Sequence, residues 1–479
     1  MVYHGTRFPQ FEGTYFFADY QTGDLWALRY DGNVVTEVRT LPLNEPGIAA
    51  FGTDPRNGDL LVVDFNSGVV RRLTYIEPPA GPVLPGTLAE TGVFANPANR
   101  SVPPGVISYQ VNVPSWADNG VLQRWFTVPD TNLTVAWKAD GNWSFPTGTV
   151  WIQHIDLRTN AILPRIPVET RLLVRTTDGV YGATYRWGGQ TNATLVGEAG
   201  DSELFTITDS SGNLVRNLNW IYPSRTDCIR CHNSTGGFAL GFNTAQLNLN
   251  RSYPSSEFPG ATGTSANQIS SLAAVGYFGN PVPDPATLPA FALWNNPSAT
   301  LEWRVRSYLA ANCVQCHQAD VLQSGNWDAR YHISLPQSSI IWGWLNQNFG
   351  NSNAHVITPH SLTNSMIFQR LGAFVGTRMP PVGSSLVDTN NLNLMAQWIA
   401  TLSDLQPPYL RMTSGPHEGE VSLRWPADPD FFDLFATTNP ALPISWSRET
   451  TSIVVSNGQR IVTVPVNSEP RKFYQLESR

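Results

Sequence analysis

The sequence predicts a multidomain α+β fold, with β-rich segments at both ends and a mostly α-helical region between them. Its 479 residues leave room for three or four domains of ordinary size. Glycine (38 residues) and proline (37 residues) are frequent, which favours β-rich modules with many loops. Apolar residues alternate along both ends of the chain and recur at helical spacing in its middle. The expected segments are 1–76, 86–222, 223–295, 296–405 and 408–479.

The charge balance argues against nucleic acid as a partner. The net charge is −7 at pH 7, and the two lysines of the chain are Lys138 and Lys472. No run of basic residues forms a patch that phosphates could bind. No apolar stretch approaches the roughly eighteen residues that a membrane-spanning helix needs, so we expect no membrane span.

Two β-hairpins repeat near the N-terminus. Residues 13–28 and residues 60–73 each hold two apolar strands around an Asp-aromatic-x-x-Gly turn. The positions that align at a constant offset are Asp19 with Asp64, Gly23 with Gly68 and Leu28 with Leu73. The offset of 45 residues is typical of the length of a propeller blade. A propeller with so few blades cannot close into a ring. We therefore interpret segment 1–76 as a partial β-propeller whose earlier blades lie upstream of this sequence.

Short strands separated by Gly, Pro and Asn turns follow a proline-rich linker at residues 78–85. The predicted strands lie at residues 125–128, 148–155, 170–175 and 183–187. Their spacing is typical of an antiparallel sandwich, so segment 86–222 is expected to be a β-sandwich-like domain. We interpret its tryptophans as core residues, with a carbohydrate-binding face as the alternative. His154 lies in the middle of a strand and is expected to be a packed core histidine.

Two C-x-x-C-H motifs, Cys228–His232 and Cys313–His317, contain all four cysteines of the chain. Cysteines three residues apart lie one helical turn from each other, so both sulfurs can form thioethers with one porphyrin. The histidine that follows then binds the iron. The motifs therefore predict two covalently attached haems c. The predicted attachment points are Cys228, Cys231, Cys313 and Cys316, and the predicted iron ligands are His232 and His317.

Two other interpretations of the cysteines stay open. The four thiols together could form a zinc site, or each pair could be a redox dithiol. Zinc does not explain why a histidine follows both pairs, and no thioredoxin-like βαβ pattern surrounds either pair. We therefore favour haem.

The second lobe, segment 296–405, resembles the class I cytochromes c. A helix predicted over residues 301–312 runs directly into Cys313, and a helix over residues 391–402 closes the lobe. Between them lies Met379-Pro380-Pro381. The resemblance implies that the Met379 sulfur binds iron opposite His317. Met366 and Met395 are competing thioethers, which their helical patterns assign to the core.

The first lobe, segment 223–295, offers fewer ligands. Ser224 or Asp227 is expected to cap the short helix that carries the first motif. No methionine or histidine lies between His232 and His317, so the first haem has no local sixth ligand. Remote candidates are His154, His355 and His360.

The N-terminal segment carries a further resemblance. The residues concerned are Tyr3-His4-Gly5, Gly13-x-Tyr15-x-Phe17-Ala18-Asp19-Tyr20-x-x-Gly23 and Gly58-Asp59-Leu60. They resemble the end of the glucose/sorbosone dehydrogenase family, sugar dehydrogenases that use pyrroloquinoline quinone (PQQ) on a six-bladed propeller. The family's catalytic and quinone-binding residues lie in earlier blades, so we assign no catalytic residue here and expect PQQ only in the missing part of the propeller. The motif order over residues 86–405 is similar to that of bacterial proteins in which such a propeller is fused to a di-haem cytochrome c region.

The C-terminal segment, 408–479, returns to a β pattern. Its predicted strands lie at residues 421–425, 453–456, 461–466 and 473–476. We expect a small Ig- or fibronectin-like β-sandwich that acts as an adhesion or spacing module and carries no chemistry.

Together these features predict a di-haem c-type cytochrome module, periplasmic or extracellular, that relays electrons from a PQQ-type sugar or alcohol oxidation to a periplasmic acceptor. Haem c is attached outside the bacterial cytoplasm, and the first residues lack the pattern of an export signal, so the signal is expected upstream. The expected partners are a redox protein or a quinoprotein dehydrogenase domain, with a carbohydrate as substrate. The alternatives are a di-haem peroxidase-like enzyme with an open first haem, and a carbohydrate-binding protein with accessory haems.

Overall fold

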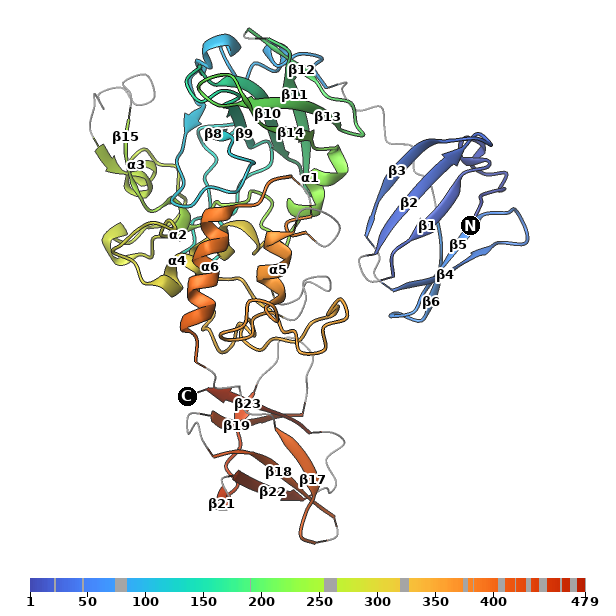
Figure 1. Cartoon of the computed structure of the whole chain (residues 1–479), viewed down its shortest axis with the longest axis vertical. Coiled ribbons are helices and arrows are strands. Elements are labelled where there is room, and N and C mark those ends of the chain that lie inside the picture. Colours follow the sequence, from blue (N-terminus) through green and yellow to red (C-terminus); the bar gives the residue numbers. More distant parts are fainter. Residues whose placement is uncertain are drawn as a thin grey trace. The chain divides into compact units, whose positions relative to one another are not determined.

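The computed structural model is mixed and strand-rich, with 23 strands and six α-helices among the residues that it describes (Figure 1). These residues are 1–20, 23–44, 47–73, 84–189, 191–253, 265–318, 327–373, 378–381, 383–403, 410–417, 419–427, 432–438, 446–456, 459–465 and 472–478. The described strands form seven sheets. The α+β expectation is confirmed at this level.

The chain divides into two compact units. The first comprises Met1–Gly325 with Arg370–Met395, and the second comprises Asn326–Gln369 with Ala396–Arg479. This division differs from the predicted boundaries, because the expected second haem lobe, 296–405, is shared between the two units. Most of the predicted proline-rich linker lies outside the described residues.

Within the first unit, the N-terminal residues form two three-stranded antiparallel sheets. Their strands are β1 (Tyr15–Ala18), β2 (Asp24–Tyr30), β3 (Val35–Asn44), β4 (Ile48–Thr53), β5 (Leu60–Asp64) and β6 (Val69–Arg72). In both predicted hairpins the glycine N–H donates to an aspartate carbonyl, at 3.0 Å from Gly23 to Asp19 and 3.0 Å from Gly68 to Asp64. Both glycines have a positive φ, 72° and 68°, which other residues rarely adopt. The two hairpins and the repeat of their turns are therefore confirmed.

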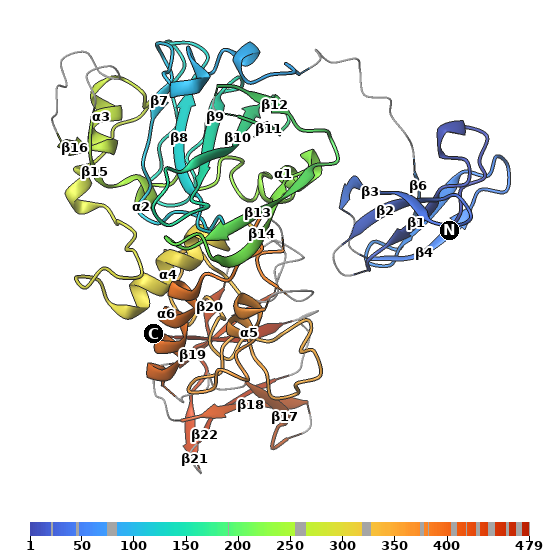
Figure 2. The same cartoon turned by 45° about the horizontal axis from the view of Figure 1, so that its top comes forward.

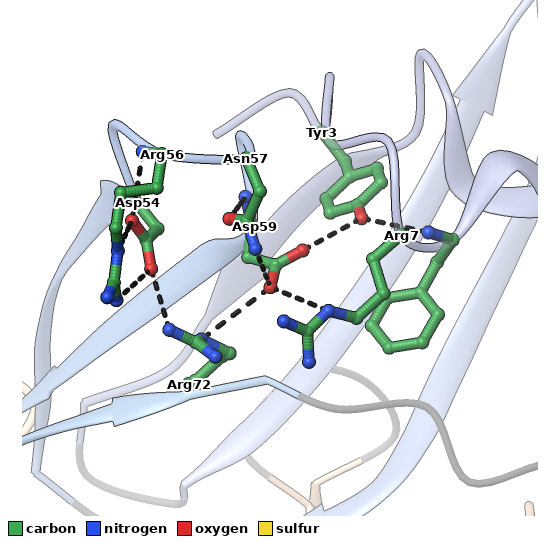
Figure 3. A network of polar contacts seen from close by, with 8 residues as sticks. Tyr3, Arg7, Asp54, Arg56, Asn57, Asp59 and Arg72 are labelled. Carbon is green, nitrogen blue, oxygen red and sulfur yellow. Dashed lines mark hydrogen bonds and ion pairs between the residues drawn. The ribbon is translucent and has the colours of Figure 1, made fainter.

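Two buried aspartates connect the first residues of the chain to the β4–β5 loop and to β6 (Figure 3). Asp59 pairs with Arg7 Nε at 3.0 Å. Asp54 accepts hydrogen bonds from a terminal nitrogen of Arg56 at 2.9 Å and from one of Arg72 at 2.6 Å. Because a carboxylate leaves water at a high cost unless it is paired, these contacts compensate the burial of both aspartates, and removing one partner of a pair would destabilise this region.

The four strands predicted in segment 86–222 are confirmed, and they belong to a six-stranded antiparallel sheet. The strands are β7 (Ile107–Ser108), β8 (Val121–Thr127), β9 (Val150–Leu157), β10 (Ile166–Arg175), β11 (Val180–Trp187) and β12 (Ala193–Leu195). Each strand pairs with its neighbours in the chain, in the order β12–β11–β10–β9–β8–β7. A separate hairpin of β13 (Asp201–Thr208) and β14 (Leu214–Tyr222) packs against β9 and β10 as a second layer.

The six-stranded sheet buries both of its faces, because consecutive side chains of a strand point to opposite sides. The neighbouring residues that divide between two apolar clusters are Trp125 and Phe126, Ile152 and Trp151, and Leu172 and Leu173. The cluster around Phe126 is covered by Phe242, α2 (Thr244–Leu247) and α3 (Gln268–Ala274). In both views the two helices lie nearer to β8 than to β12 (Figure 1, Figure 2). The predicted segments 86–222 and 223–295 therefore share one core rather than forming two domains.

Most tryptophans of segment 86–222 belong to the core. Six of them are more than nine-tenths buried: Trp125, Trp137, Trp143, Trp151, Trp187 and Trp220. The core interpretation is confirmed for these six, and none of them is free to form a carbohydrate-binding face.

The region predicted to be mostly helical contains short helices separated by long loops. Besides α2 and α3 these are α1 (Arg225–Cys231), α4 (Leu301–Asn312), α5 (Met366–Gly372) and α6 (Thr389–Thr401). A small sheet of β15 (Asn250–Ser252) and β16 (Ser265–Asn267) interrupts them. The helix predicted at 301–312 is confirmed with the same bounds, but loops predominate in the described part of residues 223–405, so the region as a whole is not mostly helical. No described helix has the length and apolar character needed to cross a membrane.

In the second unit, the C-terminal residues form two small antiparallel sheets. The first has the order β17 (Arg411–Ser414), β18 (Glu420–Pro426), β22 (Gln459–Pro465), β21 (Val454–Ser456). The second has the order β20 (Ser447–Arg448), β19 (Phe432–Thr437), β23 (Phe473–Ser478). Trp425, Leu434 and Val462 share one core, so the two sheets pack face to face as a β-sandwich requires.

We expect acid to loosen the N-terminal sheets through Asp54. Hydrogen bonds from Arg56 hold the pKa of this carboxyl below its ordinary value of 3.8. A depressed folded-state pKa stabilises the fold above the unfolded pKa, and this stabilisation is lost as the pH falls below that value. Hydrogen exchange of peptides from β5 and β6, corrected for the intrinsic rate at each pH, should show protection lost on acidification. Asp54→Asn should lower protection at neutral pH and flatten this response, while peptides from β8 serve as the internal control.

Candidate haem-attachment site

The first C-x-x-C-H motif begins on a capped helix. The Ser224 side chain accepts a hydrogen bond from the Asp227 N–H at 3.0 Å, and the Asp227 carboxylate accepts one from the Ser224 N–H at 3.0 Å. Both predicted capping residues therefore act together in a reciprocal capping box. The cap starts α1 at Arg225 and so places Cys228 and Cys231 one turn apart at the end of the helix.

His232 closes the motif with a defined tautomer. Its backbone N–H donates to the Cys228 carbonyl at 2.9 Å, and its ring Nδ1 lies 2.6 Å from the Phe238 carbonyl oxygen. A carbonyl can only accept, so Nδ1 carries the proton and Nε2 keeps a lone pair that can bind a metal ion. Burial lowers the pKa of His232, which favours this neutral form.

The loop that supplies the Phe238 carbonyl has an unusual backbone. Gly237 and Phe238 both have a positive φ, 73° and 62°. For phenylalanine this conformation is uncommon and is retained only where the surroundings enforce it. The Arg175 guanidinium lies 4.1 Å from the centre of the Phe238 ring and holds the ring from the side of the sheet.

The second motif follows a different helix, α4, and begins at the residue after its end. Thr300 caps α4 by accepting a hydrogen bond from the Trp303 N–H at 3.1 Å. The Cys313 N–H donates to the Leu309 carbonyl at 2.8 Å, and the His317 N–H donates to the Cys313 carbonyl at 2.9 Å. The histidine-to-cysteine hydrogen bond is thus the same length in both motifs.

The two motifs lie next to each other. The thiols of Cys231 and Cys316 are coupled to each other: the neighbouring sulfur raises the pKa of Cys231 and lowers that of Cys316. The flanking loops also touch, since Gln318 Nε2 donates to the Thr235 carbonyl at 3.1 Å. No pattern in the sequence indicated this proximity.

The segment that contains Met379 is connected to the end of α4 through hydrogen bonds of Trp116. The Met379 N–H donates to the Arg370 carbonyl at 3.1 Å. Farther along the segment, the Leu386 carbonyl accepts from Trp116 Nε1 at 2.8 Å, and the Trp116 N–H donates to Asn312 Oδ1 at 2.9 Å. Trp116 therefore joins the segment that follows Met379 to the residue that precedes Cys313.

Asp118 fixes the same segment from the sheet side. Its carboxylate accepts hydrogen bonds from the Ser385 N–H at 2.7 Å and the Leu386 N–H at 2.8 Å. Sequence reasoning missed both Trp116 and Asp118, because their partners lie more than 190 residues away along the chain.

The competing ligands are placed differently. Met366 and Met395 lie in α5 and α6 and are buried, as expected of core residues. His154 is fully buried; its Nδ1 lies 2.8 Å from Thr170 Oγ1 and its Nε2 lies 3.1 Å from Asp156 Oδ1. The core interpretation of His154 is therefore confirmed, and both ring nitrogens are engaged. His355 and His360 belong to the second unit.

All four cysteines are free and half-buried. In the part of the chain that the structure describes, no group of three or more His, Cys, Asp or Glu side chains is assembled to hold a metal ion, and this includes a four-cysteine zinc site. Cys228 packs against β11, where a Cβ added to Gly182 would lie 2.5 Å from its sulfur. Position 182 therefore has to be glycine for Cys228 to keep its place.

Comparison with protein-family models, with curated proteins and with solved structures finds no match for this chain.

The burial of Cys313 predicts a slow thiol in the haem-free chain. Burial raises its pKa from 9.0 to about 12, so at a given pH much less of it is thiolate. Since the thiolate is the reactive form, alkylation by iodoacetamide at about pH 8 should be at least roughly tenfold slower than for an ordinary cysteine. Peptide mass spectrometry measures the rate. Guanidinium-unfolded chain should react at the ordinary rate, and equal rates in the folded and unfolded chain would contradict the prediction.

Proposed function

We propose that this chain is a di-haem c-type cytochrome module that relays electrons. Cys228 and Cys231 would hold one haem with His232 on its iron. Cys313 and Cys316 would hold the other with His317 on its iron. Met379 is the proposed sixth ligand of the second haem. The electrons would come from a PQQ-type sugar or alcohol oxidation and pass to a periplasmic acceptor, with the chain outside the cytoplasm.

One observation carries the proposal, namely that the two C-x-x-C-H motifs share one backbone hydrogen bond, although the first motif lies at the end of α1 and the second follows α4. In each, the histidine N–H donates to the carbonyl of the first cysteine at 2.9 Å. In the first motif, the Phe238 carbonyl also fixes the imidazole with Nε2 unprotonated. Proximal haem ligands need this arrangement, because a second hydrogen bond orients the ring and selects its tautomer.

The contact between the two motifs supports a relay. A bound haem supplies one-electron Fe(III)/Fe(II) chemistry, so a two-electron oxidation of an alcohol has to be divided into single steps. The chain's part is to hold the two attachment points close together and keep each imidazole oriented. The hydrogen bond from Gln318 to the Thr235 carbonyl and the close approach of Gly236 to Gln315 do the former.

The test is haem content with spin state. The full chain, preceded by an export signal and produced in a host that attaches haem c, should bind two haems per chain in the pyridine haemochrome assay. Cys228→Ala/Cys231→Ala and Cys313→Ala/Cys316→Ala should each bind one. A Met379→Leu variant should keep two haems but lose the methionine–iron charge-transfer band, and its reduction potential should fall by part of the about 0.8 V range that axial ligands control.

Three outcomes would redirect the proposal. Absence of covalent haem from the exported chain would refute it. A charge-transfer band that persists in Met379→Leu would exclude Met379 as the ligand. A high-spin first haem that shifts on addition of peroxide would favour the peroxidase-like alternative.

The packing of Cys228 on β11 leads to a prediction that concerns the first haem alone. A valine side chain at position 182 would occupy the place of the Cys228 sulfur. We expect Gly182→Val to lower haem content from two to about one per chain, because strand packing tolerates no overlap of this kind. Gly188→Val is the matched control, since nothing lies within 4 Å of a Cβ added there. Equal haem content in both variants would show that Cys228 does not depend on Gly182.

A further inference from the structure

We propose that, in the haem-free chain, Cys231 and Cys316 form a disulfide that joins the two C-x-x-C-H motifs. The inference goes beyond the proposed function, because it concerns the chain before any cofactor is attached. It also differs from the pairing that the spacing alone suggests, which is a disulfide within each motif.

The geometry brings these two cysteines together from loops that are already in contact. A Cβ added to Gly236 would lie 2.6 Å from the Cys231 carbonyl oxygen and 3.4 Å from Cβ of Gln315, the residue before Cys316. Beside them, Gln318 Nε2 donates to the Thr235 carbonyl at 3.1 Å. The two thiols are also close enough for each to shift the pKa of the other. The approach is therefore a property of both loops and not of the two side chains alone.

The other cysteine of the first motif has a different neighbourhood. Cys228 donates a hydrogen bond to the Ser224 carbonyl, with a sulfur–oxygen distance of 3.5 Å, and its sulfur packs against Gly182. Pairing with Cys231 would pull this sulfur out of both contacts. Cys231 instead lies beside the loop that carries Cys316.

The chemistry needs a disulfide oxidant, for which oxidised glutathione suffices. One of the two cysteines, as its thiolate, attacks a sulfur of oxidised glutathione; a mixed disulfide forms and one glutathione thiolate leaves. The second cysteine loses its proton to solvent and attacks the mixed disulfide, and the second glutathione thiolate leaves. Two cysteine thiols are oxidised and one glutathione disulfide is reduced to two thiols. Cys231 and Cys316 are half-buried rather than enclosed, so a small disulfide can reach them.

The consequence concerns both motifs at once. Each motif would lose one of the two thiols that it needs for two thioether bonds. A single disulfide would thus keep both motifs from completing haem attachment until it is reduced.

Tryptic cleavage provides a direct test, because Arg230 separates the cysteines of the first motif. The full chain, produced without haem and reduced, is equilibrated with reduced and oxidised glutathione, blocked with N-ethylmaleimide and digested. We expect peptide 231–251 linked to peptide 307–330, with peptide 226–230 carrying N-ethylmaleimide. The link should survive in Cys228→Ala and in Cys313→Ala, which leaves Cys316 as the partner in the second peptide. It should be absent from Cys231→Ala.

A link between peptides 226–230 and 231–251 would overturn the proposal, and so would a bridge inside peptide 307–330 or four blocked thiols. Unfolding in guanidinium gives a second measurement. The yield of the link between motifs should fall by at least roughly tenfold, because a long loop then has to close without the folded contacts. An unchanged yield in the unfolded chain would mean that the native geometry does not direct the pairing. Failure of haem attachment in the exported chain would leave this result unaffected, so the two proposals fail separately.

Discussion

The burial of both faces of the six-stranded sheet is the constraint on which the candidate site depends. Strand geometry sends Trp125 and Phe126 to opposite sides, and each such side chain contributes about 1.5–3 kcal/mol only when it is covered. The face of the sheet that carries Phe126 is covered by residues that follow the first motif, including Phe242 and α3. The chain after His232 is therefore held against the sheet. That position presents the Phe238 carbonyl to the imidazole.

The same dependence explains why short helices suffice around the motifs. Helices of seven to 13 residues are marginal by themselves, so their ends need tertiary contacts. Trp116 and Asp118 precede β8 and supply such contacts, since they bind Asn312 at the end of α4 and the Leu386 backbone. The residues that precede β8 and the residues that follow Met379 thus stabilise each other. The motif region is accordingly built into the β domain and is not an independent helical lobe.

Features that depend on residues close together in the sequence were predictable, and features that depend on residues far apart in the sequence were not. The Asp19 and Asp64 turns and the capping box of Ser224 were predictable because each rests on residues within a few positions. The bounds of α4 followed from apolar spacing. The contact of Cys231 with Cys316 and the need for glycine at position 182 join segments far apart in the chain, and single-sequence patterns carry no such information. The shared core of segments 86–222 and 223–295 was missed for the same reason.

The two motifs share a backbone hydrogen bond but not a scaffold. α1 begins with a reciprocal capping box and packs on β11, whereas α4 is longer and is capped by Thr300. Cys228 and Cys231 lie in the last turn of α1, whereas Cys313 and Cys316 follow the end of α4. In both motifs the histidine backbone N–H nevertheless donates to the carbonyl of the first cysteine. This bond spans four residues, as in a helical turn, so it forms within each motif, and the two scaffolds determine only where each motif lies.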